Sequence, residues 1–120
     1  MRRVLGHAAF VVLAVSLAGA AIAQKATRGG FWGAIAYSTK TGSYGYAVNR
    51  TTKRDAETEA FRICGTNCDL IRTFRNGCGA VAVRPKRFAS DTGASREIAE
   101  AKALRKCGDA CKIAVWACTR

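Results

Sequence analysis

The sequence predicts a small single α+β domain with the element order ββαββαβ, in which two helices lie on one face of a largely antiparallel sheet. Three observations lead to this fold class. Short runs of alternating residues lie between turn residues, two runs with helical periodicity each begin at a capping residue, and six cysteines recur at repeated spacings. The cysteines also predict that disulfides staple the domain and that it contains an approximate internal repeat.

The first 23 residues resemble a secretory signal peptide. Arg2 and Arg3 form a positive end, residues 8–20 are apolar, and residues 21–23 (AIA) are a small-residue cleavage site. The apolar run is shorter than the roughly 20 residues that cross a bilayer, and no second run of that length follows. We therefore expect export to the periplasm or the extracellular medium, and a domain over residues 24–120 without a transmembrane segment.

Two strands are expected at the start of this domain. Residues 31–38 (FWGAIAYS) alternate in a way that suits a strand with one face of small residues, and residues 44–49 (YGYAVN) place Tyr and Val side chains on one face. Thr41 and Gly42 between them favour a tight turn. The two strands should therefore form a hairpin.

The first helix should begin after Thr52, which resembles the N-cap of a capping box with Asp55 three residues later. Ala56, Ala60 and Cys64 then lie on one stripe of the helix. The glycine that follows Cys64 should end the helix, because it accepts the left-handed conformation common at helix ends.

Two further strands are expected over residues 68–76 and 79–85. The dipeptide at residues 76–77 (NG) favours a tight hairpin turn between them. Pro85 should end the second strand, and residues 86–93 are predicted to be a polar loop.

The last two predicted elements are a helix and a strand. Ser95 should cap the helix, which runs to Cys107, and Gly108 should then turn the chain. Residues 111–118 (CKIAVWAC) are expected to form the final strand.

The cysteines belong to a repeated motif. The pattern AExxAxRxCGxxC occurs at residues 56–68 and again at residues 99–111, a constant offset of 43 positions. Six cysteines in a small exported chain indicate a disulfide framework. Since equivalent positions should pair equivalently, we expect the bonds Cys64–Cys68, Cys107–Cys111 and, by exclusion, Cys78–Cys118.

A redox centre and a zinc site are the alternatives for these cysteines. A thioredoxin-like centre has two residues between its cysteines, and here there are three. A zinc site would have to use thiolates alone, because His7, the one histidine of the chain, leaves with residues 1–23. We therefore expect no metal and no cofactor.

No arrangement of residues predicts a catalytic centre. Without histidine a Ser-His-Asp arrangement is excluded. The carboxylates near the helix starts (Asp55, Glu57, Glu59, Glu97 and Glu100) are explained by capping and by the helix dipole. The sequence therefore predicts that the protein is not an enzyme.

Basic residues strongly outnumber acidic ones. The chain has 20 Lys and Arg against 8 Asp and Glu, and 18 basic residues stay once Arg2 and Arg3 leave with the leader. This excess favours an anionic partner, such as an envelope polymer, a lipid surface or a protein, whereas specific nucleic-acid recognition is not expected. The alternative is a basic surface that only keeps the domain soluble. The candidate anion-binding residues are Arg50, Lys53 and Arg54; Arg72 and Arg75; and Arg84, Lys86 and Arg87.

Several aromatic side chains could stack on a ligand or fill the core. At strand spacing in so small a domain we expect most of them in the core. Tyr44 or Tyr46 is the expected exception. The set comprises Trp32, Tyr37, Tyr44, Tyr46, Phe74 and Trp116.

The stretches WGAIAYS, YGYAVN, AETEAFRICGTNC, NGCGAVAV and AEAKALRKCGDAC together resemble the exported bacterial "domain of unknown function 4189" family. Its members share a WGAIAY opening, a helix ending in Cys-Gly-x-x-Cys and a Cys-Gly-Ala strand. The resemblance covers nearly all of residues 24–120 and implies an exported, disulfide-containing domain. It supplies no catalytic or ligand-binding residues. Secreted mycobacterial relatives that are discussed as acting on host cells suggest the same role as an alternative here.

These observations lead to one functional hypothesis and two alternatives. We expect a non-enzymatic binding module whose basic surface takes an anionic envelope component or a protein. The first alternative is a secreted effector or inhibitor that acts on a protein target, and the second is a small enzyme of the cell envelope. The oligomeric state stays open.

Overall fold

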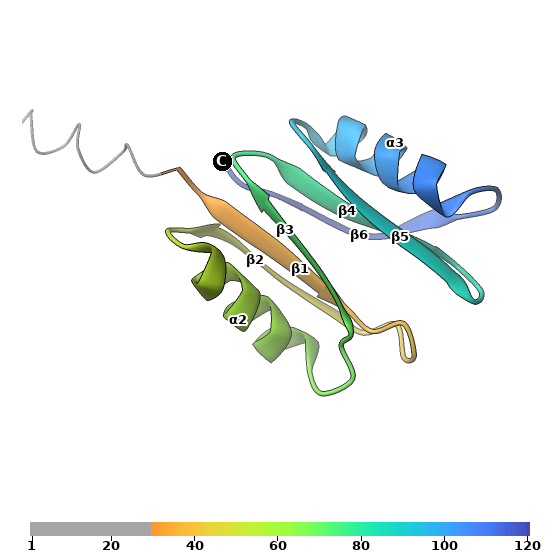
Figure 1. The fold of residues 1–120 in the computed structure, drawn as a ribbon, viewed down its shortest axis with the longest axis horizontal. Coiled ribbons are helices and arrows are strands. Elements are labelled where there is room, and N and C mark those ends of the chain that lie inside the picture. The colour runs from red at the N-terminus through yellow and green to blue at the C-terminus, as the bar shows by residue number, and fades with distance from the viewer. Residues whose placement is uncertain (1–29) are drawn as a thin grey trace, which may run out of the picture.

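Residues 30–120 are described by the computed structural model, and the expected signal peptide over residues 1–23 lies outside them. Within these residues the chain forms a small α+β domain with two helices and two three-stranded antiparallel sheets. Figure 1 shows their arrangement. The elements are β1 (Trp32–Tyr37), β2 (Tyr44–Arg50), α2 (Lys53–Cys64), β3 (Leu70–Arg75), β4 (Cys78–Arg84), β5 (Arg87–Gly93), α3 (Arg96–Cys107) and β6 (Lys112–Cys118).

Both helices begin and end where the sequence predicts. Thr52 and Ser95 are the N-caps, and each side-chain oxygen accepts a hydrogen bond from the backbone N–H three residues further on, at 3.1 and 3.2 Å. Each helix ends at a glycine with positive φ, 103° at Gly65 and 98° at Gly108. Capping residues therefore determine the length of both helices.

The two sheets are built from the same ββαβ unit. The first has the strand order β2-β1-β3 with α2 between β2 and β3, and the second has the order β5-β4-β6 with α3 between β5 and β6. In each unit the first strand is central and pairs antiparallel with both edge strands. The repeat seen at the cysteines thus extends over the whole domain.

The observed order is ββαβββαβ, so one strand was missed. The missed strand is β5, which occupies the segment predicted to be a polar loop. Pro85 ends the strand before it, as predicted, but with Lys86 it reverses the chain into β5, since Arg84 pairs with Arg87 across them. The side chains of β5 are mostly small or polar, so its alternation carries little hydrophobic signal.

The prediction of one sheet with both helices on one face is also wrong. Figure 1 shows the two sheets face to face, with α2 outside the first and α3 outside the second. Asn76 and Gly77 link the two sheets instead of forming a hairpin, because β3 pairs with β1 and β4 pairs with β5 and β6. Asn76 N–H donates to the carbonyl of Phe31 at 2.9 Å, and Gly77 N–H donates to Thr119 Oγ1 at 2.8 Å.

Three apolar clusters hold the four layers together. Alanines of β1 pack against alanines of α2, and alanines of β4 pack against alanines of α3. The small side chains let each helix lie close to its sheet. The third cluster lies between the sheets and contains Ile35, Tyr37, Phe74, Val81, Val115 and Ala117.

The ring of Phe74 fills space against both central strands. A Cβ added at Gly33 would lie 2.3 Å from this ring, and one added at Gly79 would lie 2.7 Å from it. Gly33 pairs with Phe74, whereas Gly79 pairs with Ala117, the equivalent residue of the second unit. One phenyl ring therefore serves both units, and glycine at these two positions admits it.

Three disulfides staple the domain, with the pairing that the repeat predicts. Each short bond joins the end of a helix to the segment before the next strand. The long bond joins the neighbouring strands β4 and β6. The bonds are Cys64–Cys68, Cys107–Cys111 and Cys78–Cys118.

Candidate functional site

The first cluster of candidate basic residues lies where β2 leads into α2. Arg50 is the last residue of β2, and Lys53 and Arg54 begin the helix. All three side chains are exposed. They form an exposed basic patch at the junction of β2 and α2.

The second cluster is used in the fold. Arg72 Nε donates to Ser90 Oγ at 3.0 Å, and its Nη2 donates to the Ser90 carbonyl at 3.1 Å, so this side chain ties β3 to β5. Arg75 lies over the ring of Trp32, 5.4 Å from its centroid. Arg72 is therefore held within the fold, whereas Arg75 stays exposed and lines, with Lys102, a further cavity of about 290 Å³.

The third cluster lies in and beside the β4–β5 turn. Arg84 and Arg87 face each other across the turn, and Pro85 and Lys86 form its tip. Pro85 suits the first tip position because its ring fixes φ near about −65°. Lys86 has a φ of 63°, in the left-handed region that favours glycine. The turn therefore holds three cations in a short hairpin.

A cavity lies between this turn and the β1–β2 turn. Its volume is about 260 Å³. Tyr37 and Val83, the last apolar residues of the two central strands, form part of its wall, and the basic residues of the β4–β5 turn line it beside them. We call it the inter-hairpin pocket. It is lined by Tyr37, Thr39, Val83, Arg84, Lys86, Arg87 and Phe88.

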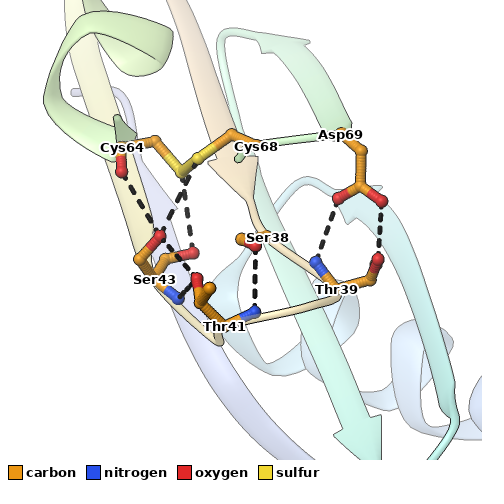
Figure 2. Close-up of a disulfide and its surroundings, with 7 residues drawn as sticks. All are labelled: Ser38, Thr39, Thr41, Ser43, Cys64, Cys68 and Asp69. Atoms are coloured by element: carbon orange, nitrogen blue, oxygen red, sulfur yellow. Dashed lines mark hydrogen bonds between the residues drawn. A yellow bond between two sulfur atoms is a disulfide. The ribbon is translucent and has the colours of Figure 1, made fainter. Parts of the chain in front are cut away.

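Hydroxyl groups hold the β1–β2 turn on one side of this pocket (Figure 2). Ser38 Oγ accepts a hydrogen bond from Thr41 N–H at 3.1 Å. Thr41 Oγ1 accepts a second one from Ser43 N–H at 3.3 Å. Ser43 Oγ also donates to the carbonyl of Cys64 at 3.3 Å, beside the Cys64–Cys68 disulfide. The turn is therefore anchored to the end of α2.

Arg87 anchors the other turn in the equivalent way. Its Nε donates to the carbonyl of Cys107, and its Nη2 donates to the carbonyl of Lys106 at 3.5 Å. Cys107 is the last residue of α3 and is bonded to Cys111. A cation at a helix C-terminus is also favourable for the helix dipole. Each short disulfide therefore lies beside the anchor of one hairpin turn.

One carboxylate lies beside the pocket. Asp69 accepts hydrogen bonds from Thr39 N–H at 3.0 Å and from Thr39 Oγ1 at 2.5 Å. The hydroxyl and the backbone N–H of Thr39 lower the pKa of Asp69. No Asp or Glu lines the pocket itself, so its charged lining is entirely basic.

The structure places the candidate aromatic residues in two groups. Tyr37 and Phe74 are buried and Trp32 is partly buried, so half of the six residues lie in or beside the core, where most were expected. Tyr44 and Tyr46 are about half exposed, as expected for the exceptions, but Trp116 is 40% exposed and was expected in the core. Trp116 lies on an edge strand under Arg96, whose guanidinium carbon is 3.9 Å from the ring centroid.

Sequence analysis missed the residues that join the basic cluster in the pocket. Thr39 and Phe88 come from segments with no binding motif, and Tyr37 was assigned to the core alone. Phe88 belongs to the same hairpin as the basic turn, whereas Tyr37 and Thr39 meet that turn because the two units pack face to face. The signal in the sequence was the equivalence of the two units, in which Tyr37 and Val83 occupy matching places.

Two kinds of feature are missing from residues 30–120. No group of three or more His, Cys, Asp or Glu side chains lies together so that it could hold a metal ion. Neither α2 nor α3 is long and apolar enough to cross a bilayer.

Comparison with known proteins places the domain among proteins of unestablished function. The sequence model of a family described as "Domain of unknown function (DUF4189)" matches residues 32–118. Protein Rv1269c of Mycobacterium tuberculosis is 36% identical over 88 residues, which are 72% of this chain and 68% of that protein. Uncharacterized protein Rv1813c of the same organism is 35% identical over 88 residues and is covered over 59% of its length.

A solved structure agrees with the fold. The NMR structure of Rv1813c from Mycobacterium tuberculosis superposes with a TM-score of 0.63 at 35% sequence identity. The match covers 73% of this chain and 74% of that one. The similarity therefore extends over most of both chains.

Proposed function

The chain belongs to the DUF4189 family, whose description assigns no activity, so we propose a function from the geometry of the structure. We propose that the protein is a non-enzymatic module that binds an anionic group in the inter-hairpin pocket. The group is a phosphate or carboxylate of an envelope component or of a protein. The observation that carries the proposal is the cluster of Arg84, Lys86 and Arg87 around one cavity with no acidic lining residue.

The chemistry of the pocket supports an anion. Guanidinium and ammonium groups form charge-assisted hydrogen bonds with phosphate and carboxylate oxygens, about twice as strong as neutral ones. Arg87 is held in place by the end of α3, so it contributes mainly its charge. Arg84 and Lys86 are exposed at the turn, and their donors can turn toward a ligand.

The conformation of Lys86 is a second support. A left-handed backbone costs a non-glycine residue about 1–2 kcal/mol, and glycine would avoid this cost. A lysine at a φ of 63° therefore destabilises the turn relative to a glycine. Lys86 lines the pocket, and its positive charge there is a physical reason for a lysine at this position.

Export is part of the same proposal. Three disulfides in a small domain are compatible with an oxidising compartment. The leader predicted over residues 1–23 agrees with this location. In such a compartment the anionic groups of envelope polymers and lipids would be accessible to the pocket.

Paired charge-removal variants test the pocket. Binding of the disulfide-bonded protein to phosphatidylglycerol vesicles, inorganic pyrophosphate and duplex DNA would be measured by calorimetry at low and near-physiological salt. The double variant Arg84→Gln with Lys86→Gly should weaken binding of the preferred probe at least about fivefold, near 1 kcal/mol. Lys86→Gly should also stabilise the fold by about 1 kcal/mol, so lost binding cannot be due to unfolding.

The control removes the same charge elsewhere. Arg50→Gln with Lys53→Gln lies outside the pocket and should weaken binding much less at near-physiological salt, where long-range effects are screened. Equal weakening by the two double variants would show that only net charge matters. Binding that disappears for every probe at near-physiological salt would reduce the basic surface to a solubility feature.

A further inference from the structure

A second cavity lies between the edge strands β2 and β6, with a volume of about 410 Å³. It shares no lining residue with the inter-hairpin pocket. From β2 it is lined by the alternate residues Tyr44, Tyr46 and Val48, and from β6 by the consecutive residues 114–118. We call it the β2–β6 groove.

This difference in lining shows what each strand presents. Successive side chains of a strand point to opposite faces, so alternate residues mark one face of β2. Consecutive residues include side chains of both faces, which means that the backbone edge of β6 borders the groove. The groove is therefore a strand edge next to a row of half-exposed side chains.

The edge of β6 has room for a further strand. Its sheet has the order β5-β4-β6, so β6 pairs with β4 alone among the described strands. In the stacked sheets β6 contacts both β1 and β2, so the space beside β6 lies against β2. A strand added there would lie about 4.8 Å from β6 and about 10 Å from the first sheet. It would cover Tyr44 and Tyr46, which are 48% and 47% exposed.

The equivalent space in the other unit is closed. Arg72 pairs with Ile35 as Val115 pairs with Val81, so these two residues are equivalent in the repeat. Arg72 spans from β3 to Ser90 of β5 through two hydrogen bonds. Val115 is too short to reach from β6 to β2 as Arg72 reaches from β3 to β5. Tyr46 of β2 occupies the position that Ser90 has in β5. Because Val115 and Tyr46 replace Arg72 and Ser90, the β2–β6 groove stays open and has aromatic side chains in its lining.

Charge around the groove points to the chemistry of its partner. No Asp or Glu lines it. Lys112 begins β6 at one end, and at the other end Arg120 is held by its N–H donating to Asn49 Oδ1 at 2.9 Å. Arg96 stacks on Trp116 beside the same strand, but its guanidinium is already paired with Glu100 at 3.0 Å, so the free positive charge lies at the two ends. Acidic side chains on a bound segment would face cations at both ends.

We propose that the β2–β6 groove binds an extended, acidic segment of a partner protein as a fourth strand of the sheet β5-β4-β6. Main-chain hydrogen bonds to the β6 edge provide the binding, and alternate side chains of the segment pack on Tyr44, Tyr46 and Val48. A peptide main chain matches a continuous strand edge of five residues, which is why we infer a peptide here. This proposal stands apart from the pocket and its anion.

A displayed library of random peptides, about nine residues long and therefore long enough to pair with the seven-residue β6, tests the proposal on the disulfide-bonded protein. The expected enriched sequences alternate apolar and polar residues and carry Asp or Glu. Their affinity should fall about tenfold or more for Tyr44→Ala with Tyr46→Ala. A proline at the centre of an enriched peptide should have a similar effect, because it removes a ladder hydrogen bond.

Phe88→Ala is the matched control. Phe88 is 45% exposed on β5, the strand equivalent to β2, and lies outside the groove. Its replacement should leave peptide affinity within about twofold. Amide hydrogen exchange adds a direct readout, since bound peptide should slow exchange in residues 112–118 and leave residues 87–93 unchanged.

Several results would overturn the proposal. Enriched peptides without alternation or acidic residues would do so, as would peptides that tolerate a central proline or bind the double tyrosine variant equally well. A failure to enrich any peptide would also count against it. Slowed exchange in residues 112–118 that depends on protein concentration alone would instead assign the groove to a second copy of the chain.

Discussion

At the scale of single residues, Phe74 has the clearest structural role. Its ring is 5% exposed and packs on Gly33 and Gly79, the glycines of the two central strands. The second unit has Ala117 at the equivalent position, so it has no ring of its own there. Within the inter-sheet cluster, Phe74 is therefore the side chain that contacts the glycines of both central strands.

Phe74→Ala should lower the free energy of unfolding by about 3–5 kcal/mol, because it removes a buried ring and leaves a cavity. Urea unfolding monitored by circular dichroism measures this loss. Phe88→Ala removes the same atoms from a half-exposed site and should cost much less. Equal losses for the two variants would mean that Phe74 does not hold the sheets together.

Asp69 links the β1–β2 turn to the start of β3, and its charge makes this link depend on pH. The pKa of Asp69 is lowered by the hydroxyl and the backbone N–H of Thr39. A carboxyl whose pKa is lower in the folded state stabilises the fold above its unfolded pKa, about 3.9 for Asp. This contribution is lost as the pH falls through the lowered value.

We therefore expect Asp69→Asn to be less stable than the unmodified protein at neutral pH, and the difference should shrink below about pH 4. Thermal unfolding at a series of pH values measures both curves. A difference that stays constant from neutral to acid would show that the carboxylate charge has no part in the contact.

At the scale of elements, the three disulfides have different tasks. The Cys78–Cys118 bond closes a long loop, with a sequence separation of 40, whereas each short bond spans 4. The short bonds lie beside the carbonyls of Cys64 and Cys107, which accept from Ser43 and Arg87 of the hairpin turns. The Cys-Gly-x-x-Cys motif therefore occurs twice because each unit has one hairpin turn to anchor.

The long bond should contribute more stability than a short one. On the chain-entropy account its removal should cost about 4 kcal/mol, and removal of a short bond about 2 kcal/mol. Paired Cys→Ala variants at positions 78 and 118 and at positions 64 and 68, compared by urea unfolding, test this order. A larger loss at positions 64 and 68 would show that anchoring the turn outweighs loop closure.

At the scale of the whole molecule, the two ββαβ units together form the two surfaces for which binding is proposed. The pocket lies where the turns of the two units meet, and the groove lies where the edge of one unit is left uncovered by the other. Neither surface exists in a single ββαβ unit. The proposed functions therefore belong to the packed pair and depend on the same inter-sheet core.

Local features could be predicted from the sequence because their causes are local. The N-caps at Thr52 and Ser95, the first hairpin and the spacing of the disulfides follow from turn chemistry, periodicity and an internal repeat. The basic turn at Lys86 was also visible, but not as a turn inside a sheet. Family membership was predicted from motifs and is confirmed over residues 32–118.

The tertiary structure decided which strands pair and which side chains meet. Asn76 and Gly77 carry a hairpin signal, yet β3 pairs with β1, because pairing is decided by packing between segments far apart in the chain. Trp116 has strand spacing like the core residues, but its strand is an edge. The sequence by itself thus determined every element except β5, the disulfides and the charge. The stacking of two sheets determined the pocket and the groove, since both arise from contacts between units that no local pattern encodes.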